Sequence, residues 1–305
     1  MKSKLALITG ATGFLGRNLC EKLIENNYQI IIIARESSNL DFFEQYKSNI
    51  KAIFKINNNN FAIIDNIIAK FRPDITYYLV AAFDKGKTYE EVLNLINTNI
   101  IFGTELLRCL VKYDCKNFIN IGTYWQHYKS QEYNPVNLYA ATKQAFQDII
   151  KYYQEAEQLC SITLKIYDTY GRGDYRNKII NILKKSLKEN KELNMSGGEQ
   201  YLNLIHIDDV IEAILITTQK IYDKNKLYCG KSFFLSSNKL IKLKDLIKLI
   251  EKINGKKLNI KLGALSYRKR EIMLPYIGEV LPGWYPKIKL EDGLRDFFGS
   301  NRENN

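Results

Sequence analysis

The stretch Leu5-Ala-Leu-Ile-Thr-Gly10-Ala-Thr-Gly-Phe-Leu-Gly16 sets a short apolar run directly before three glycines. A helical pattern follows to Glu25, with apolar residues three and four positions apart. The glycines therefore lie at a strand-to-helix turn, where backbone N–H groups can approach a pyrophosphate and the helix N-terminus attracts it. The spacing GxxGxxG alone also fits tight helix–strand packing, but its position favours a dinucleotide site. The residues predicted to form this site are Gly10, Thr12, Gly13, Phe14, Leu15 and Gly16.

Beyond this turn, short β-branched runs alternate with amphipathic helical patterns up to about residue 170. This alternation is typical of βαβ units, so we predict an α/β fold with a doubly wound parallel sheet. Strands are expected at 5–9, 30–34, 52–56, 75–81, 118–121 and 162–166, with helices at 14–25, 63–71, 89–112 and 139–158.

The chain has 305 residues, which is enough for about two lobes. We assign residues 1–170 to a dinucleotide-binding domain and expect segments near 201–225 to return to it. In residues 171–305 the alternation is less regular. We expect this part to be mainly a smaller substrate-binding lobe over the carboxyl ends of the strands, where open α/β sheets bind ligands.

Composition and charge exclude several other classes of protein. The net charge is +12, but the lysines are spread along the chain rather than gathered in a basic arm, so no nucleic-acid partner is predicted. No stretch reaches the ~18 apolar residues of a membrane-spanning helix, and the first apolar run is too short for a signal peptide. The five cysteines are scattered and form no CxxC pair. We therefore predict a soluble cytoplasmic protein with reduced thiols, no membrane association and no metal site.

The end of the second predicted strand bears on which dinucleotide is bound. Strand 30–34 ends at Ala34, where an acidic residue would bind the ribose hydroxyl of NAD, and Arg35 follows with a guanidinium suited to the phosphate of NADP. Ser37 and Ser38 add donors, so NADP(H) is favoured. NAD remains the alternative cofactor because of Glu36. A one-residue error in where the strand ends would make Glu36 the acidic residue that binds the ribose hydroxyl of NAD.

A candidate catalytic set follows the fifth predicted strand. Tyr139 and Lys143 are four apart in a helical pattern and share one face. A cationic lysine and an oxidised nicotinamide nearby would lower the pKa of the tyrosine, making it effective in proton transfer. Thr123 stands just past strand 118–121, where its hydroxyl could hold a substrate oxygen. We predict Thr123, Tyr139 and Lys143 as catalytic, with Tyr139 and Lys143 also contacting the cofactor.

Taken together, these motifs resemble the extended short-chain dehydrogenase/reductases. The resemblance rests on GATGFLG near the start, Asn97-Thr-Asn99-Ile-Ile-Phe-Gly103-Thr104, Thr123, Tyr139/Lys143, Tyr170-Gly171 and His206-Ile-Asp208-Asp209, and covers nearly the whole chain. It implies a Rossmann-type core, a nucleotide-diphosphate sugar as substrate and a homodimer built on helices near residues 100 and 145. It also implies cofactor contacts from Ala81, Ala82 and Asn99.

Departures from the family's patterns narrow the expected reaction. The sugar-nucleotide dehydratases carry an Asp-Glu pair directly after the catalytic threonine, and the GDP-fucose synthases carry a cysteine two residues after the hydroxyl residue. Here Tyr124 and Trp125 follow Thr123. The remaining resemblance is to 4-keto-reductases of the CDP-abequose and CDP-paratose synthase type. It implies NADPH-dependent C4 reduction of a nucleotide-linked 4-keto-6-deoxysugar, possible as a hexose or a heptose, for bacterial surface polysaccharide.

Candidate substrate-binding residues follow from this expectation, with alternatives for several of them. Asp168 suits either a sugar contact or a strand cap, and His127 either faces the sugar or packs its loop. By resemblance, Arg268 is the first candidate to bind the diphosphate, followed by Arg176 and Lys178, and each of them also fits a solvated surface charge. A 4-epimerase with tightly held NAD and a non-catalytic NADP sensor are the competing functions. The predicted substrate-binding residues are Thr123, Trp125, His127, Asp168, Arg176, Lys178 and Arg268.

Overall fold

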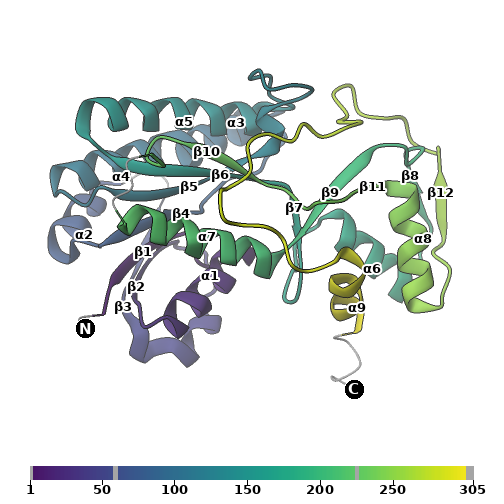
Figure 1. The fold of residues 1–305 in the computed structure, drawn as a ribbon, viewed down its shortest axis with the longest axis horizontal. Coiled ribbons are helices and arrows are strands. Elements are labelled where there is room, and N and C mark those ends of the chain that lie inside the picture. Colours follow the sequence, from purple (N-terminus) through teal and green to yellow (C-terminus); the bar gives the residue numbers. More distant parts are fainter. Residues whose placement is uncertain (1–2, 58–60, 224–226, 300–305) are drawn as a thin grey trace.

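The computed structural model describes residues 3–57, 61–223 and 227–299. Within these residues, a seven-stranded sheet has the order β10-β6-β5-β4-β1-β2-β3, and every neighbouring pair is parallel (Figure 1). The predicted doubly wound parallel sheet is confirmed. Its strands are β1 (Leu5–Thr9), β2 (Gln29–Arg35), β3 (Ile50–Ile56), β4 (Ile75–Tyr78), β5 (Asn117–Thr123), β6 (Cys160–Ile166) and β10 (Ser232–Leu235).

Helices cover both faces of this sheet, and each face has its own apolar core. Buried on both sides, β1 and β2 read as continuous runs of aliphatic residues. One face is covered by α1 and α7, which contact each other, and the other face by α2, α4 and α5 (Figure 1). The helices of this part are α1 (Phe14–Glu25), α2 (Ile63–Phe71), α3 (Tyr89–Ile96), α4 (Phe102–Lys112), α5 (Leu138–Glu157) and α7 (Ile207–Tyr222), with 3-10 segments η1 (Asp41–Asn49) and η3 (Tyr124–Gln126).

One long predicted helix is interrupted. The periodic pattern over 89–112 predicted a single helix, but a π-helical turn, η2 (Asn97–Ile101), separates α3 from α4. Apolar spacing does not reveal this turn, because one extra residue leaves the flanking helices periodic. π-Turns inside helices occur frequently at functional sites, and this one carries Asn99.

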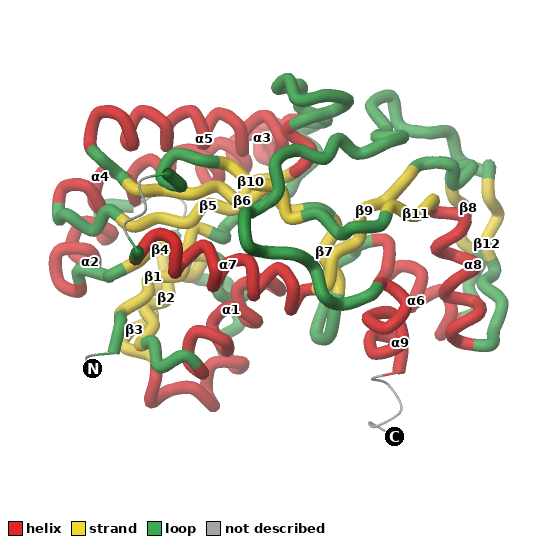
Figure 2. Tube along the Cα trace, in the orientation of Figure 1, coloured by secondary structure: helices red, strands yellow, loops and turns green. Residues whose placement is uncertain are grey.

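A second group of elements packs around a separate core (Figure 2). It contains a sheet of order β11-β9-β7 and a parallel pair, β12-β8. α7 packs against β5 and β6, and β10 joins the edge of the main sheet, so the chain returns to the first group after residue 206. The boundary between two lobes stays a prediction. The elements of the second group are β7 (Asp168–Tyr170), α6 (Ile179–Glu189), β8 (Leu193–Met195), β9 (Tyr201–His206), β11 (Leu240–Lys242), α8 (Leu243–Asn254), β12 (Ile260–Leu262) and α9 (Leu290–Gly299).

The prediction that all thiols are reduced is wrong for two cysteines. Cys160, at the start of β6, forms a disulfide with Cys229, which lies just before β10. These residues are 69 positions apart, and only the parallel pairing of β10 with β6 brings them together. Cys20, Cys109 and Cys115 are free and buried. Each helix in the described part of the chain is too short or too polar to span a lipid bilayer.

Candidate active site

The glycine-rich turn follows β1 and needs its glycines for close approach. Gly10 has φ +72°, and a side chain there would place its Cβ 2.7 Å from the backbone nitrogen of Val80. At Gly16 a Cβ would lie 2.2 Å from the carbonyl oxygen of Gly10. The Gly13 backbone N–H donates to the Gly10 carbonyl at 3.1 Å and closes the turn. A cradle without side chains at the start of α1 fits the pyrophosphate of a dinucleotide.

The loop after β7 also reaches this turn. The Tyr175 hydroxyl donates to the Thr12 carbonyl oxygen at 3.1 Å. The Arg176 guanidinium carbon lies 4.4 Å from the ring centroid of Phe14, the first residue of α1. The predicted cofactor and substrate segments are therefore in contact at this point.

Most donors of Arg176 are already engaged within the protein. The guanidinium binds both carboxylate oxygens of buried Asp174, at 2.8 and 2.9 Å, and the Thr169 carbonyl oxygen at 2.8 Å. These contacts fix the loop that carries Tyr175. A substrate contact from Arg176 stays a prediction.

At the end of β2, Arg35, Glu36 and Ser37 are exposed and Ser38 is half-buried. The Ser38 backbone N–H donates to the Arg35 carbonyl at 3.0 Å, which folds the segment into a tight turn. Ala34 is buried at the end of the apolar part of the strand. Because both Arg35 and Glu36 face solvent here, the choice between NADP and NAD stays a prediction.

Thr123 lies at the carboxyl end of β5, as the sequence predicted, and is buried. Its Oγ1 accepts a hydrogen bond from the Trp125 backbone N–H at 3.3 Å. Its own backbone N–H donates to Oε1 of buried Gln126 at 3.0 Å. Because Oγ1 accepts in this contact, the hydroxyl proton remains to be donated to a substrate oxygen.

Tyr139 and Lys143 lie in the first two turns of α5, whose N-terminus is capped by the Asn137 side chain through the Ala140 backbone N–H. The Lys143 side chain is buried, with 2 % of the residue exposed, and its Nζ lies 5.6 Å from the ring centroid of Tyr78. The Tyr139 ring is half-buried and meets Phe83 edge to face, with centroids 5.0 Å apart.

Burial sets the proton affinities of this pair. It lowers the pKa of Lys143 to about 8 and raises the pKa of Tyr139 to about 12. In the chain alone, the pKa of the tyrosine therefore moves opposite to the direction predicted for a site with oxidised nicotinamide. At neutral pH the phenol keeps its proton, which is the state that a proton donor requires.

Asn99, predicted to contact the cofactor, holds the loop after β4. Its Oδ1 accepts from the Ala82 backbone N–H at 2.8 Å, and its Nδ2 donates to the Ala82 carbonyl at 3.1 Å. Nδ2 also donates to Thr142 Oγ1 on α5 at 2.9 Å. β4 ends at Tyr78 rather than at residue 81, so Ala81 and Ala82 lie in this loop. Asn99 thus ties the loop to the helix that carries Tyr139 and Lys143.

Trp125 and Lys178, predicted from distant parts of the sequence to bind substrate, meet next to Tyr139. Phe83, which the sequence reasoning missed, contacts both of them: its ring centroid is 5.7 Å from that of Trp125 and 4.9 Å from the Lys178 Nζ. Phe83 follows the Ala81-Ala82 pair, and its 55 % exposure is unusual for a phenylalanine. No local motif marks it.

His127 is buried next to Lys165 of β6. The Lys165 Nζ lies 2.7 Å from the His127 Nε2, and the other ring nitrogen lies 3.2 Å from the Glu132 carbonyl oxygen. With Nδ1 donating to that carbonyl, Nε2 accepts from the lysine. Burial and the Lys165 charge lower the pKa of His127, and burial lowers the pKa of Lys165 to about 8. These contacts hold the loop after Thr123, and a sugar contact from His127 stays a prediction.

Replacing Lys165 with methionine is expected to change how stability depends on pH. In the wild-type protein, Lys165 is charged in both the folded and the unfolded state below pH 8. Burying that charge therefore lowers the free energy of unfolding by about 3 kcal/mol in this pH range. The unfolded state binds more protons between pH 8 and ~10.4, so this cost disappears as the pH rises. The stability of Lys165→Met minus that of wild type should therefore fall by about 3 kcal/mol from pH 7.5 to 10.5. Urea unfolding measures it. Lys151→Met, at an exposed lysine of α5, should show no such fall.

Asp168 begins β7, and its Oδ2 accepts a hydrogen bond from the Tyr124 hydroxyl at 3.0 Å. The Tyr124 ring stacks on Tyr167, with centroids 4.6 Å apart. Asp168 is half-buried, so one side of its carboxylate is fixed while part of the residue remains accessible. Both predicted roles, sugar contact and structural contact, therefore remain.

Arg268 is exposed, and its backbone exchanges hydrogen bonds with Glu271. Two residues later, Arg270 contacts the loop that follows Thr123. Its guanidinium carbon lies 4.4 Å from the Tyr128 ring centroid, and its Nη2 donates to Asn134 Oδ1. Its buried Nε has no hydrogen-bond partner among the described residues. Arg268 stays the predicted diphosphate ligand, and Arg270 is a cation that the sequence reasoning missed.

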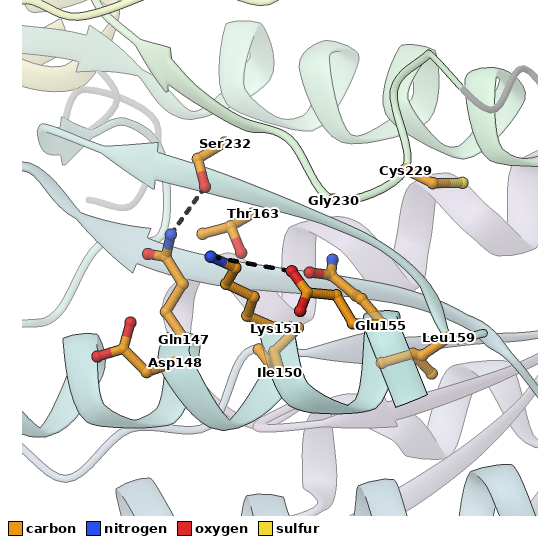
Figure 3. Close-up of a pocket in the computed structure, with 11 residues that line it drawn as sticks. Gln147, Asp148, Ile150, Lys151, Glu155, Leu159, Thr163, Cys229, Gly230 and Ser232 are labelled. Atoms are coloured by element: carbon orange, nitrogen blue, oxygen red, sulfur yellow. Dashed lines mark hydrogen bonds and ion pairs between the residues drawn. The ribbon is translucent and has the colours of Figure 1, made fainter. Parts of the chain in front are cut away.

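A cavity of about 380 Å³ lies between α5, β6 and the segment before β10 (Figure 3). Gln147 on its wall donates from Nε2 to Ser232 Oγ at 2.9 Å and accepts from Gln126 Nε2 at 3.0 Å. Since Gln126 also binds the backbone N–H of Thr123, a chain of hydrogen bonds joins the cavity wall to the candidate catalytic residue. This cavity is distinct from the surroundings of Tyr139.

The chain belongs to the NAD dependent epimerase/dehydratase family, whose model matches residues 6–229. The predicted resemblance is thereby confirmed at the level of the family.

Among curated proteins, the chain is similar to a CDP-abequose synthase of Yersinia pseudotuberculosis, with 27% identity over 88% of this chain and 90% of the relative. It is also similar to a CDP-abequose synthase of Salmonella muenchen, with 26% identity over 96% of both chains.

Two solved structures show the same fold. A UDP-glucose 4-epimerase from Thermotoga maritima, solved with UDP-glucose, has a TM-score of 0.85, 23% identity and coverage of 98% of this chain and 99% of its own. A UDP-glucuronic acid 4-epimerase from Bacillus cereus, solved with UDP-glucuronic acid and NAD, has a TM-score of 0.84, 21% identity and the same coverages.

Proposed function

We propose that the protein is an NADPH-dependent reductase that converts the C4 ketone of a nucleotide-linked 4-keto-6-deoxysugar to an alcohol. The observation that carries this proposal is that α5, which bears Tyr139 and buried Lys143, packs against β5, which ends at Thr123, and against the following turn, where Tyr124 and Trp125 stand. An acid–base pair for elimination is missing from those two positions. The similarity to two CDP-abequose synthases over most of the chain supports the same substrate class.

The protein's own residues provide the proton and hold the ketone. Bound NADPH supplies the hydride that reduces C4. Tyr139 donates its phenolic proton to the oxygen as the carbonyl becomes an alkoxide, so that ketone, hydride and proton together give the alcohol. The Thr123 hydroxyl donates a hydrogen bond to the same oxygen. The Lys143 charge stabilises the phenolate until solvent returns its proton.

The glycine-rich turn, Arg35, Ser37 and Ser38 are proposed to bind NADP(H). The turn holds the pyrophosphate, and the exposed Arg35 guanidinium pairs with the 2′-phosphate. Arg268 and Lys178 are proposed to meet the diphosphate of the sugar nucleotide, which suits an anionic substrate on a chain of net charge +12. A homodimer through α4 and α5 is also proposed, and sedimentation velocity measures it.

An NADPH oxidation assay tests the reaction. We expect NADPH consumption with a CDP-linked 4-keto-6-deoxysugar or its 3-deoxy analogue, and NMR of the product should show a C4 alcohol. GDP- and dTDP-linked ketones define the base preference. In parallel, the nucleotide released from denatured protein identifies the resident cofactor.

Opposite results favour the epimerase. Stoichiometric NAD in the purified protein, no NADPH consumption with any of these ketones, and interconversion of C4 epimers without added cofactor would replace the reductase by a 4-epimerase. A protein that binds NADPH but has neither activity would be the non-catalytic sensor.

A further inference from the structure

Three side chains from separate parts of the fold meet beside Tyr139. Phe83 comes from the loop after β4, Trp125 from the 3-10 turn after Thr123, and Lys178 is the residue that precedes α6. The Phe83 ring lies 5.0 Å from the Tyr139 ring and 5.7 Å from the Trp125 ring, measured between centroids. The sugar carbons next to C4 must lie close to whatever surrounds the Tyr139 hydroxyl. The rings of Phe83 and Trp125, which we call the wall, are therefore within reach of the substrate.

Hydrogen bonds to the backbone hold the residues of the wall in place. The Asn99 amide binds both backbone groups of Ala82, the residue before Phe83, and Asn99 is fully buried. Trp125 is held through its backbone, since its N–H donates to Thr123 Oγ1 and its carbonyl accepts from the Val136 N–H at 2.9 Å. Two aromatic faces fixed in this way form a preorganised surface rather than mobile loop side chains.

Lys178 contacts this surface through its charge. Its Nζ lies 4.9 Å from the Phe83 ring centroid and 5.5 Å from the Trp125 ring centroid. Among the described residues, no carboxylate forms an ion pair with Lys178. A cation over partly exposed rings is held weakly, whereas a charge-assisted hydrogen bond to a phosphate is stronger. An arriving diphosphate can therefore draw the ammonium away from the rings.

We propose that Phe83 and Trp125 form the wall that recognises the deoxygenated positions near C4, which are C3 and the C6 methyl group, and that Lys178 leaves this wall to bind the diphosphate. The inference rests on the proposed function and adds the residues that select the sugar. A C–H or methyl group packs against the rings without loss. A hydroxyl at the same place gives up its hydrogen bonds to water and finds no partner on the rings. The expected preference for the deoxygenated sugar is about 10- to 100-fold in affinity.

Calorimetric titration separates the two roles. The probes are CDP, CDP-glucose and CDP-3,6-dideoxyglucose, with GDP and dTDP forms if these bind more tightly. Wild type should bind the dideoxy sugar about 10- to 100-fold more tightly than the glucose form. Phe83→Gln should reduce that ratio to about 3-fold or less, because it provides an amide partner for a hydroxyl, and should leave the affinity for CDP within about 2-fold.

Lys178→Met should behave in the opposite way. It should weaken binding of CDP and of both sugar nucleotides by about 10-fold, reduce the salt dependence of binding, and keep the sugar preference. Lys185→Met is the matched control, since Lys185 is an exposed lysine of the helix that follows Lys178, and should bind all probes as wild type does. Phe83 is mostly exposed, so its variant should fold, and thermal unfolding checks this.

The outcomes distinguish this inference from the proposed function. If Phe83→Gln keeps the wild-type sugar preference, or Lys178→Met keeps the wild-type affinity for CDP, the wall and its cation are assigned wrongly, even if the ketone is reduced. If no ketone is reduced but the preferences change as stated, the reaction is wrong and the wall is right.

Discussion

Replacing Tyr139 with phenylalanine is expected to lower kcat for ketone reduction by about 10²- to 10⁴-fold, the usual contribution of a positioned proton donor. The substitution removes one oxygen and keeps the ring that packs against Phe83. Because the pKa of Tyr139 is about 12 in the chain alone, wild type carries the transferable proton throughout the neutral range. The variant lacks it at every pH.

The measurement is NADPH oxidation at saturating ketone, together with NADPH affinity from cofactor fluorescence. NADPH affinity should fall by less than about 10-fold, because the turn at Gly10 is untouched and only the predicted contact of the Tyr139 hydroxyl with the cofactor is lost. Tyr152→Phe is the matched control: Tyr152 lies on the same helix, is 60 % exposed, and should keep wild-type kcat. A Tyr139→Phe enzyme within about 3-fold of wild-type kcat would remove the phenol from the mechanism.

The parts of the molecule that the sequence predicted are those encoded locally. The turn at Gly10 is recognisable because glycines between a strand pattern and a helix pattern are typical of a backbone that must approach a phosphate closely. Tyr139 and Lys143 are recognisable because four positions on a helix bring two side chains to one face. The side chains that surround them depend on which strands are adjacent in the sheet. No local sequence pattern predicts that order.

The features that were missed depend on such long-range neighbours. Phe83 looks like an ordinary loop residue until Trp125 and Lys178 are placed beside it. Lys165 occupies a position in a buried strand where sequence reasoning expects an apolar side chain, and its partner His127 is 38 residues away. The Cys160–Cys229 disulfide is of the same kind, because β10 reaches β6 only after the chain has passed through the second group of elements.

The glycine-rich turn offers the second large effect. Replacing Gly16 with alanine is expected to lower the free energy of unfolding by about 3 kcal/mol, at the upper end of what inserting one methyl group costs. The added Cβ would lie 2.2 Å from the Gly10 carbonyl oxygen and 2.6 Å from the Ala11 Cα. Both are backbone atoms of the turn itself, so no side chain can rotate away. Alanine's better helix propensity, worth up to ~1 kcal/mol, offsets only part of this cost.

Gly13→Ala is the control. It also replaces a glycine of the turn by alanine, but without the close backbone contact expected at position 16. Gly13 has φ −74°, which any residue adopts, and its Cβ would meet only the Gly10 carbonyl, at 3.3 Å. Its stability should change by less than about 1 kcal/mol. Urea unfolding without cofactor, followed by circular dichroism, compares the two variants. Because relief of the clash must move either Gly10, which follows β1, or the start of α1, Gly16→Ala should also weaken NADPH binding. Equal stability of the two variants would mean that the turn relaxes freely, and a turn that relaxes freely could not hold backbone N–H groups ready for a pyrophosphate.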